Sequence, residues 1–343
     1  MKTITLGSSK ITTIQNAFGA LPIQRVSVEQ GIQIIQKAYE GGMRFFDTAR
    51  AYSDSELKLG LALEKYPRES YYIATKTMAK TPSEFEAQLE ESLKLLKTDY
   101  IDIYQFHCAT QVYKPNDGTG MYECMLKAKQ EGKIRHIGIT AHQLQIALDA
   151  VQTGLYETLQ FPFSYLSSDK ELQLVQACQK QNMGFIAMKG LAGGLINQSK
   201  PAMAFMAQFD HVLPIWGIQK ESELDEWLAF NQETPTLTSE IQAFIEKEKK
   251  ELSGDFCRGC GYCMPCPKGI MINQCARMSL MLRRAPSNAW LTKEMQAEMK
   301  KIEECIHCNQ CAKKCPYELN TPELLIKNYE DYQKVLAGEI KVQ

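Results

Sequence analysis

Two short runs of cysteine constrain this chain more than any other feature of its sequence. The first reads Cys257-Arg-Gly-Cys260-Gly-Tyr-Cys263-Met-Pro-Cys266-Pro267, and the second reads Cys305-Ile-His-Cys308-Asn-Gln-Cys311-Ala-Lys-Lys-Cys315-Pro316. Repeated Cys-x-x-Cys spacing lets one short loop turn three thiolates onto a single 4Fe–4S cluster, and in the bacterial two-cluster arrangement the cysteine before proline binds the other cluster. The runs therefore predict two 4Fe–4S clusters. We expect Cys257, Cys260, Cys263 and Cys315 on one, and Cys305, Cys308, Cys311 and Cys266 on the other.

The two runs differ slightly, and other uses of cysteine have to be weighed. Two residues separate Cys266 from the preceding cysteine, but three separate Cys315 from its own. Cys266 therefore has the shorter reach to the other cluster. Zinc sites take four ligands, usually as two separated pairs, which does not fit two runs of four. A disulfide framework needs an oxidising compartment, and no secretory signal is present. The remaining cysteines are expected to be structural or small apolar fillers: Cys108, Cys124, Cys178 and Cys275.

The bulk properties are those of an ordinary globular chain with more than one domain. Its 343 residues suggest about two domains. The formal net charge of −1 gives no bulk attraction to nucleic acid or to anionic lipid. No apolar stretch approaches the ~18 residues of a membrane span, and the N-terminus lacks the apolar segment of a signal peptide. We therefore expect a cytoplasmic protein that acts on a small molecule, with no nucleic-acid or membrane partner.

The chain before the cysteine runs alternates short apolar segments with amphipathic ones, as repeated strand–helix units do. A small hairpin is expected at 3–14, and capped helices at Ser27 and Thr81. The eight expected strands are 16–20, 44–46, 71–75, 100–106, 134–139, 158–160, 184–187 and 211–216. Eight such units fit a closed (β/α)8 TIM barrel. An open doubly wound sheet is the alternative, but no Gly-x-Gly-x-x-Gly follows the first strand.

The sequence is expected to divide near residue 252. Residues 1–252 are predicted to form the α/β barrel with a trailing helix at about 238–252. Residues 253–343 are predicted to form a small ferredoxin-like α domain that binds the two clusters and ends in a helix at about 321–336.

Four side chains suited to proton transfer follow three neighbouring strands of this barrel. Asp47 and Tyr52 follow the second strand, Lys76 the third and His107 the fourth. Residues just past the carboxyl ends of barrel strands face the active site. An ammonium beside a phenol stabilises the phenolate, so we expect Lys76 to lower the pKa of Tyr52 while Asp47 holds Lys76 in an ion pair. Singly, each residue could be a cap, a rim charge or a structural side chain, but together they predict a site.

Five segments around these residues carry a resemblance. They are Phe45-Phe-Asp-Thr-Ala-Arg-Ala-Tyr52, Ser55-Glu-Leu-Lys-Leu-Gly60, Ala74-Thr-Lys-Thr77, Gln105-Phe-His107 and Gly132-Lys-Ile-Arg-His-Ile-Gly138. They resemble the aldo-keto reductases, and with the cysteine runs the chain resembles the ferredoxin-bearing bacterial branch of that family. The resemblance implies a catalytic tetrad of Asp47, Tyr52, Lys76 and His107. It also implies hydride transfer from NADP(H) or NAD(H) to a carbonyl, with Tyr52 as general acid.

The same resemblance assigns cofactor positions, which this chain matches in part. Gln160 matches a carboxamide-binding glutamine, Thr140 stands where the family often has serine, and Met188 stands where an aromatic residue often stacks on the nicotinamide. After the eighth strand, Lys220 is followed by four acidic residues within 221–226, which disfavours a bound 2′-phosphate. The expected cofactor contacts are Thr140, Gln160, Met188, Lys189, Leu191, Gly217 and Lys220. His142, near the mouth, is expected at the surface of a helix N-terminus.

A mismatch in electron number leaves several functions open. A 4Fe–4S cluster passes one electron at a time, whereas nicotinamide gives two as hydride. A flavin, whose phosphate could approach Gly193 and Gly194, a ferredoxin or flavoprotein partner, or a substrate that tolerates a radical would join the two. We expect an oxidoreductase that reduces a carbonyl while its clusters relay single electrons. The alternatives are an electron carrier or redox-responsive protein whose barrel does not perform this reaction, and clusters that only stabilise the small domain.

Overall fold

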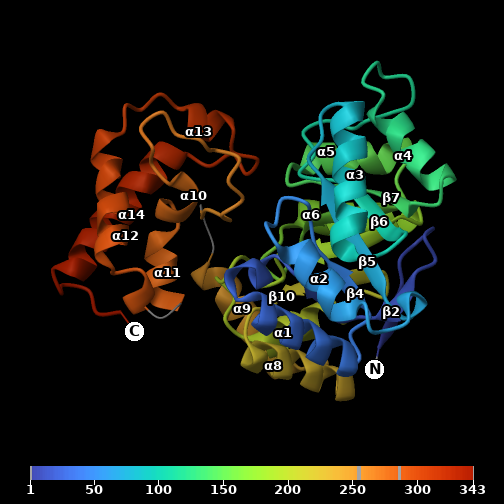
Figure 1. Ribbon diagram of the computed structural model, residues 1–343. Coiled ribbons are helices and arrows are strands. Elements are labelled where there is room, and N and C mark those ends of the chain that lie inside the picture. The colour runs from blue at the N-terminus through green and yellow to red at the C-terminus, as the bar shows by residue number, and fades with distance from the viewer. Residues whose placement is uncertain (1, 253–255, 285–286, 343) are drawn as a thin grey trace. The chain divides into compact units, whose positions relative to one another are not determined.

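The computed structural model describes residues 2–252, 256–284 and 287–342 (Figure 1). Contacts between residues divide it into two compact units. We call residues 1–190 with 199–241 the barrel unit, and residues 191–198 with 242–343 the cysteine unit. The division does not follow chain order, because the segment 191–198 makes its contacts with the cysteine unit although strands of the barrel precede and follow it.

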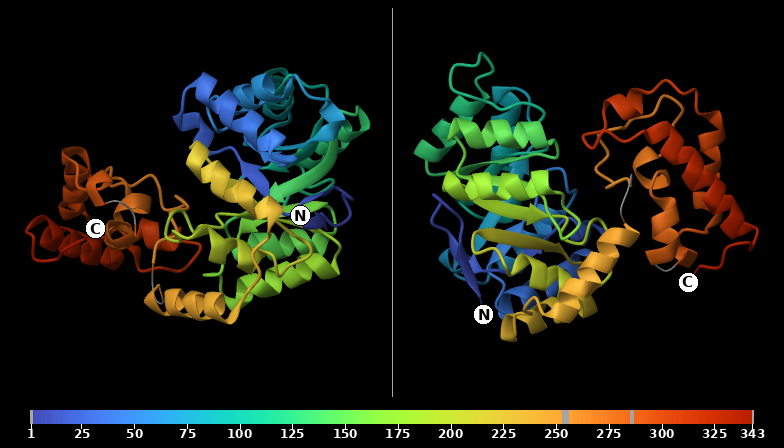
Figure 2. Two further views of the ribbon diagram at one scale, coloured as in Figure 1. Left: turned by 90° about the horizontal axis from the view of Figure 1, so that it is seen from below. Right: turned by 180° about the vertical axis from the view of Figure 1, so that it is seen from behind.

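The barrel unit contains a closed barrel of eight parallel strands, which confirms the predicted TIM-barrel fold. The ribbons place helices outside the strands (Figures 1 and 2). All eight expected strands are present within two residues of their expected bounds. They are β3 (Ala17–Gly19), β4 (Phe45–Asp47), β5 (Tyr72–Thr77), β6 (Ile101–Phe106), β7 (Ile134–Thr140), β8 (Thr158–Pro162), β9 (Gly184–Met188) and β10 (Val212–Gly217).

Two helices of this unit begin at the capping residues that the sequence predicts, Ser27 and Thr81. Gln30 N donates to Ser27 Oγ at 3.2 Å, and Glu84 N donates to Thr81 Oγ1 at 3.3 Å. Each bond satisfies a backbone N–H that the first helical turn leaves unpaired. The helices are α1 (Val28–Glu40), α2 (Ser55–Leu63), α3 (Pro82–Leu96), α4 (Met121–Gln130), α5 (Leu144–Thr153), α6 (Asp169–Lys180), α7 (Ser199–Met206) and α8 (Glu221–Gln232).

The predicted N-terminal hairpin, β1 (Thr3–Thr5) with β2 (Thr12–Ile14), lies at the amino end of the barrel. Ile4, Leu6 and Ile11 are buried in one cluster with residues such as Phe45 and Ala74 from the strands. Because aliphatic side chains fill this end, polar chemistry is left to the carboxyl ends of the strands.

A close approach between α2 and α3 gives a stability prediction. A Cβ at Gly60 would lie 2.1 Å from the carbonyl oxygen of Leu95. Backbone cannot move aside as a flexible side chain can, so we expect Gly60→Ala to lower the free energy of unfolding by about 1–3 kcal/mol. Urea unfolding measures this, with Gly31→Ala as the matched helical control. The new Cβ at Gly31 meets only side-chain carbons of Lys58 and Ile23, the nearest at 2.8 Å. Equal losses in the two variants would contradict this explanation.

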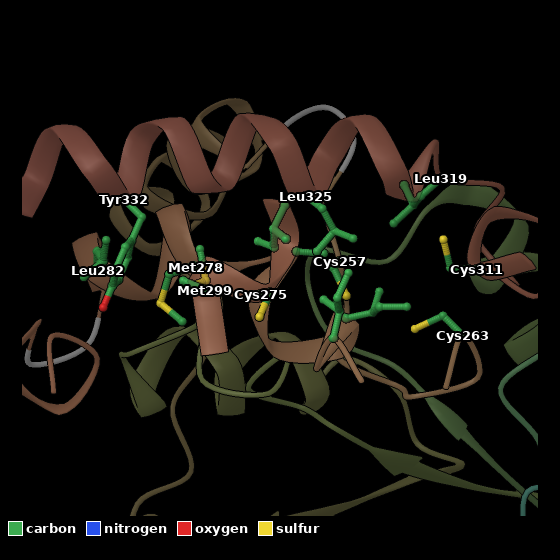
Figure 3. Close-up of a cluster of buried hydrophobic side chains, with 14 of the residues drawn as sticks. Cys257, Cys263, Cys275, Met278, Leu282, Met299, Cys311, Leu319, Leu325 and Tyr332 are labelled. Atoms are coloured by element: carbon green, nitrogen blue, oxygen red, sulfur yellow. The ribbon is translucent and has the colours of Figure 1, made fainter. Parts of the chain in front are cut away.

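The cysteine unit packs short helices around one apolar core (Figure 3). Cys257, Cys263, Cys275 and Cys311 lie in this core, and Leu325 enters it from α14. The helices are α9 (Ser239–Glu251), α10 (Ile272–Cys275), α11 (Met278–Arg284), α12 (Lys293–Lys300), α13 (Gln310–Lys313) and α14 (Thr321–Leu336), with short 3-10 turns at Ser287–Ala289 and Lys301–Glu304. The α14 helix has the bounds expected for the C-terminal helix. Among the residues described here, no helix combines the length and the apolar composition needed to cross a membrane.

The α9 helix, which we expected to trail the barrel, joins the cysteine unit from residue 242 onward. Arg284 on α11 forms a two-pronged ion pair with Glu248 on α9, with both N–O distances at 2.7 Å. Arg284 also donates to the carbonyl oxygen of Leu195 at 2.8 Å. These bonds hold α9 and the segment 191–198 to α11. The boundary that we expected between residues 252 and 253 falls at the edge of 253–255, outside the described residues.

Candidate functional site

The carboxyl ends of β4, β5 and β6, with the loop after β4, bring a carboxylate, a phenol, an ammonium and an imidazole together. Lys76 Nζ lies 2.6 Å from Asp47 Oδ1 and donates to Thr48 O at 2.6 Å. The same Nζ lies 5.3 Å from the centroid of the Tyr52 ring. The His107 ring meets the Tyr52 ring edge-on, with centroids 5.6 Å apart. The four residues singled out in the sequence are therefore neighbours.

The ion pair at the centre of this group is almost completely buried. Asp47 is 2% exposed and Lys76 is 1% exposed. Burial raises the pKa of Asp47, and the charge and hydrogen bond of Lys76 oppose that rise. Gln160 Nε2 adds a weaker donor to Asp47 Oδ1 at 3.4 Å. Because each partner compensates the other's buried charge, removing either one leaves an unpaired charge in the barrel.

Tyr52 has a raised pKa, contrary to the lowered pKa that we expected from the sequence. Burial of the phenol is the main cause, and the negative charge of Asp47 and the nearby Cys108 add to it. Lys76 does not reverse the shift because its charge is already paired with Asp47. The phenol therefore keeps its proton at neutral pH, and it can give the proton up when negative charge develops on a neighbouring oxygen.

The imidazoles of His107 and His142 are neutral at physiological pH. Burial and the charge of Lys76 lower the pKa of His107 from 6.5 to about 3. Burial, Lys189 and His107 lower the pKa of His142 from 6.5 to about 3. Our expectation that His142 lies on the surface is wrong, since it is 6% exposed and its Nδ1 lies 3.8 Å from Cys108 Sγ.

These neutral histidines should make the folded chain less stable in mild acid. Below the ordinary pKa of 6.5 the unfolded chain binds protons that the folded chain does not take up until about pH 3. The free energy of unfolding is therefore lost as pH falls through this window, by up to about 1.4 kcal/mol per pH unit for each histidine. We expect His142→Gln to flatten this dependence between about pH 7.5 and 5.5 in urea titrations. Gln143→Ala is the neighbouring control, and a wild-type slope in the His142 variant would contradict the assignment.

The cofactor positions implied by the resemblance lie at the ends of the following strands. Thr140 ends β7, and its hydroxyl accepts a hydrogen bond from Cys108 N at 2.7 Å. Gln160 in β8 accepts from Gln105 Nε2 at 3.1 Å as well as donating to Asp47. The sequence reasoning missed Gln105, although its spacing of two from His107 places both on one face of the strand. Gln105 and Gln160 thus extend the polar group around Asp47.

The remaining cofactor positions divide between the two units. Met188 ends β9, Lys189 follows it with φ +57°, and Gly217 ends β10. Lys220 is exposed immediately before α8. Leu191 belongs to the segment 191–198 of the cysteine unit.

In this polar group, three buried atoms have no hydrogen-bond partner among the described residues. They are Asp47 Oδ2, Gln105 Oε1 and His107 Nδ1. Buried polar groups are normally paired, so unpaired ones beside a site indicate a polar ligand. A nicotinamide carboxamide and a carbonyl substrate carry complementary polar groups, and the residues present fit such ligands.

Residues 217–226, which include the start of α8, contain four acidic side chains and one lysine of their own, Lys220. Glu221 and Asp225 pair with Lys37, at 3.3 and 2.6 Å. Glu223 Oε2 accepts from the backbone N–H groups of Gln219 and Lys220, at 3.0 and 3.1 Å. The surroundings of Lys220 are therefore acidic, which does not favour binding of the 2′-phosphate of NADP(H).

The cysteines of the two runs line two hollows in the cysteine unit. The members of each set come from both runs. One hollow is lined by Cys257, Cys260, Cys263 and Cys315, and the other by Cys263, Cys266, Cys305, Cys308 and Cys311. The first hollow has four thiols, and the second has four besides the shared Cys263. A 4Fe–4S cluster takes four thiolate ligands, so the residues fit two clusters. Within the described ranges, no three Cys, His, Asp or Glu side chains converge closely enough to hold a single metal ion.

Comparison with known proteins identifies both parts of the chain. Residues 3–250 match the sequence model of the aldo/keto reductase family. The chain belongs to the aldo/keto reductase family. Residues 256–320 match a 4Fe–4S dicluster domain. The resemblance to ferredoxin-bearing aldo-keto reductases that the sequence indicated is therefore confirmed for both parts of the chain.

The relatives of this aldo/keto reductase include plant and bacterial enzymes. It is 31% identical over 216 residues to L-galactose dehydrogenase of Arabidopsis thaliana, a match covering 57% of this chain and 67% of that protein. It is 36% identical over 165 residues to methylglyoxal reductase DkgB of Escherichia coli O157:H7, a match covering 45% of this chain and 60% of that protein. Aldo-keto reductase AKR11C1 from Bacillus halodurans shares its fold, with a TM-score of 0.64, 22% identity and coverage of 72% of this chain and 96% of that one. The chain thus spans about two thirds or less of the length of the plant and Escherichia coli enzymes.

Proposed function

We propose that this aldo/keto reductase is an iron–sulfur oxidoreductase that reduces a small carbonyl compound with a hydride from NAD(P)H. One observation carries the proposal: at the carboxyl end of a closed barrel, the Lys76 ammonium lies 2.6 Å from the Asp47 carboxylate and 5.3 Å from the centroid of the Tyr52 ring. The similarity to L-galactose dehydrogenase and methylglyoxal reductase supports a small polar carbonyl or alcohol as the substrate.

Tyr52 is the proton donor in this proposal. A nicotinamide cofactor, when bound, supplies the hydride. As negative charge develops on the carbonyl oxygen, Tyr52 Oη donates its proton to that oxygen. Lys76 stabilises the phenolate that remains, and Asp47 fixes the position of Lys76 through the buried ion pair.

His107 has a different role because it is neutral. With a pKa of about 3, its ring carries one N–H and no positive charge at neutral pH. In the proposed reaction this N–H donates to the substrate oxygen and orients the carbonyl toward Tyr52, whose ring it meets edge-on. His107 is therefore a hydrogen-bond donor in the reaction, while Tyr52 supplies the proton.

The acidic start of α8 leads us to expect a preference for NADH over NADPH. Lys220 is the one basic side chain in 217–226, and four carboxylates follow it. Carboxylates repel a 2′-phosphate and can accept a hydrogen bond from a 2′-hydroxyl. Comparing kcat/KM for the two dinucleotides measures this preference, and a higher value with NADPH would contradict it.

The clusters are proposed to relay single electrons in the cysteine unit. The proposed ligands are Cys257, Cys260, Cys263 and Cys315 for one cluster, and Cys266, Cys305, Cys308 and Cys311 for the other. One-electron carriers of the ferredoxin or flavoprotein class are the partners that match this chemistry. A flavin bound to this chain is the other way to join one-electron and two-electron steps.

A single anaerobic assay tests the proposed function. The purified chain is mixed with NADH or NADPH and a panel of small aldehydes and ketones that includes methylglyoxal. We expect dinucleotide oxidation that depends on the carbonyl compound. No oxidation with either dinucleotide, together with reversible reduction of the clusters by ferredoxin, would contradict the proposal and favour an electron carrier.

A further inference from the structure

Arg277 carries a buried positive charge in the cysteine unit, between α10 and α11. It is 9% exposed. The two arginines that follow it are paired, Arg283 with Asp331 and Arg284 with Glu248. Arg277, in contrast, forms no ion pair with a carboxylate in the part of the chain that the structure describes. A buried cation without a counterion is strongly destabilising, so a negative group is needed near Arg277.

The guanidinium of Arg277 lies against the loop of the first cysteine run. A Cβ built on Gly259 would lie 2.4 Å from Arg277 Nη1, so the glycine leaves room that the guanidinium uses. Gly259 N itself donates to Cys257 Sγ at 3.3 Å. The loop that carries Cys257, a proposed cluster ligand, therefore packs against one side of the Arg277 guanidinium.

The hydrogen bonds of Arg277 are incomplete. Nη2 donates to the carbonyl oxygen of Gly193 at 2.7 Å and contacts Met281 Sδ at 3.2 Å. Nε is buried and has no acceptor among the described residues. A guanidinium N–H is a strong donor, and leaving it unpaired inside a protein is costly. A sulfur acceptor next to Cys257 would satisfy both the unpaired N–H and the unpaired charge.

We infer that Arg277 is a positioning residue of the redox chemistry. It donates an N–H hydrogen bond to a sulfur of the cluster held by Cys257, Cys260, Cys263 and Cys315, and it raises the reduction potential of that cluster. The inference rests on the cluster ligands given under the proposed function.

The direction of the effect follows from charge. Four thiolates make a 4Fe–4S cluster negative, and one electron from an external reductant makes it more negative still. A fixed cation and an N–H donor therefore stabilise the reduced cluster more than the oxidised one, and the effect is strong where water is excluded. Arg277 keeps its protons in this step, so no proton accompanies the electron.

An anaerobic redox titration followed by electron paramagnetic resonance tests the inference. In Arg277→Gln, the ratio of reduced to oxidised first cluster at a fixed potential should fall at least about tenfold, which is about 59 mV for one electron. The other cluster should change by less than about threefold. An iron content of about eight per chain shows that both clusters are present, which separates a loading defect from a failure of the inference. Fully loaded Arg277→Gln with an unchanged ratio would overturn it.

Two further variants give the comparison its controls. Arg283→Gln removes a paired arginine from the adjacent helix and should leave both ratios unchanged. Arg277→Lys keeps the charge but loses the planar set of donors, so its shift should have the same sign and be smaller. Should the glutamine variant fail to load its clusters, a loaded lysine variant with the wild-type ratio would overturn the inference instead.

A spectroscopic measurement needs no change at position 277. Chain carrying Arg258→Gln, grown with arginine labelled with 15N in the guanidinium, leaves Arg277 as the arginine that lies against this loop. A hydrogen bond to cluster sulfur should give a 15N coupling in the pulsed resonance spectrum of the reduced first cluster. Its absence in fully loaded protein would show that Arg277 does not donate to the cluster.

Discussion

Replacing Tyr52 by phenylalanine is expected to lower kcat/KM for carbonyl reduction by about 10²–10⁴-fold, because the substrate oxygen loses its proton donor. The substitution removes one hydroxyl from a half-buried ring and leaves the Asp47–Lys76 ion pair in place. We therefore expect unchanged folding and unchanged dinucleotide binding. Steady-state kinetics measures kcat/KM, and a fluorescence titration with NADH or NADPH measures dinucleotide binding.

The matched control for this variant is Tyr72→Phe. Tyr72 begins β5, at the other end of the strand from Lys76. It packs against the buried apolar side chains at the amino end of the barrel. We expect its kcat/KM to be that of the wild type. Equal activities of the Tyr52 and Tyr72 variants would show that the phenol of Tyr52 does not donate the proton.

The second large effect is expected in the cysteine unit, from Cys260→Ala. Cys260 lines only the hollow that we assign to the first cluster. Its removal should lower the iron content from about eight to about four per chain and weaken the fold of the unit, because metal binding contributes to folding in small domains. Iron analysis and thermal unfolding measure these changes. The barrel unit has its own core, so carbonyl reduction by NAD(P)H should persist, while electron transfer from a ferredoxin into the first cluster is lost.

Cys275→Ala serves as the control for cluster loss. Cys275 is fully buried in the same core but lies outside both runs and lines neither hollow. We expect its iron content to stay at about eight, with a modest loss of stability from the missing sulfur. Iron loss in this variant to the level of Cys260→Ala would contradict the ligand assignment. Loss of hydride-driven turnover in Cys260→Ala would show that the clusters are required for the barrel chemistry.

Local sequence patterns determined most of the fold. The strands and helices of the barrel could be predicted because apolar periodicity and capping residues such as Ser27 and Thr81 act over a few residues. The order of Asp47, Lys76 and His107 along successive strands placed them at one end of the barrel, since parallel strands share that end. The cysteine spacing predicted two cluster sites because spacing limits which thiols can meet.

Only the tertiary structure decided how these residues behave. The raised pKa of Tyr52 and the neutral state of His142 come from burial by residues distant in sequence. Contacts among α9, α11 and the segment 191–198 likewise set the division into units and brought Arg277 to Gly193. Desolvation and charge pairing depend on distances across the fold, which a one-dimensional pattern does not encode. The sequence thus specified which groups are available for chemistry, and three-dimensional packing determined their charge states and partners.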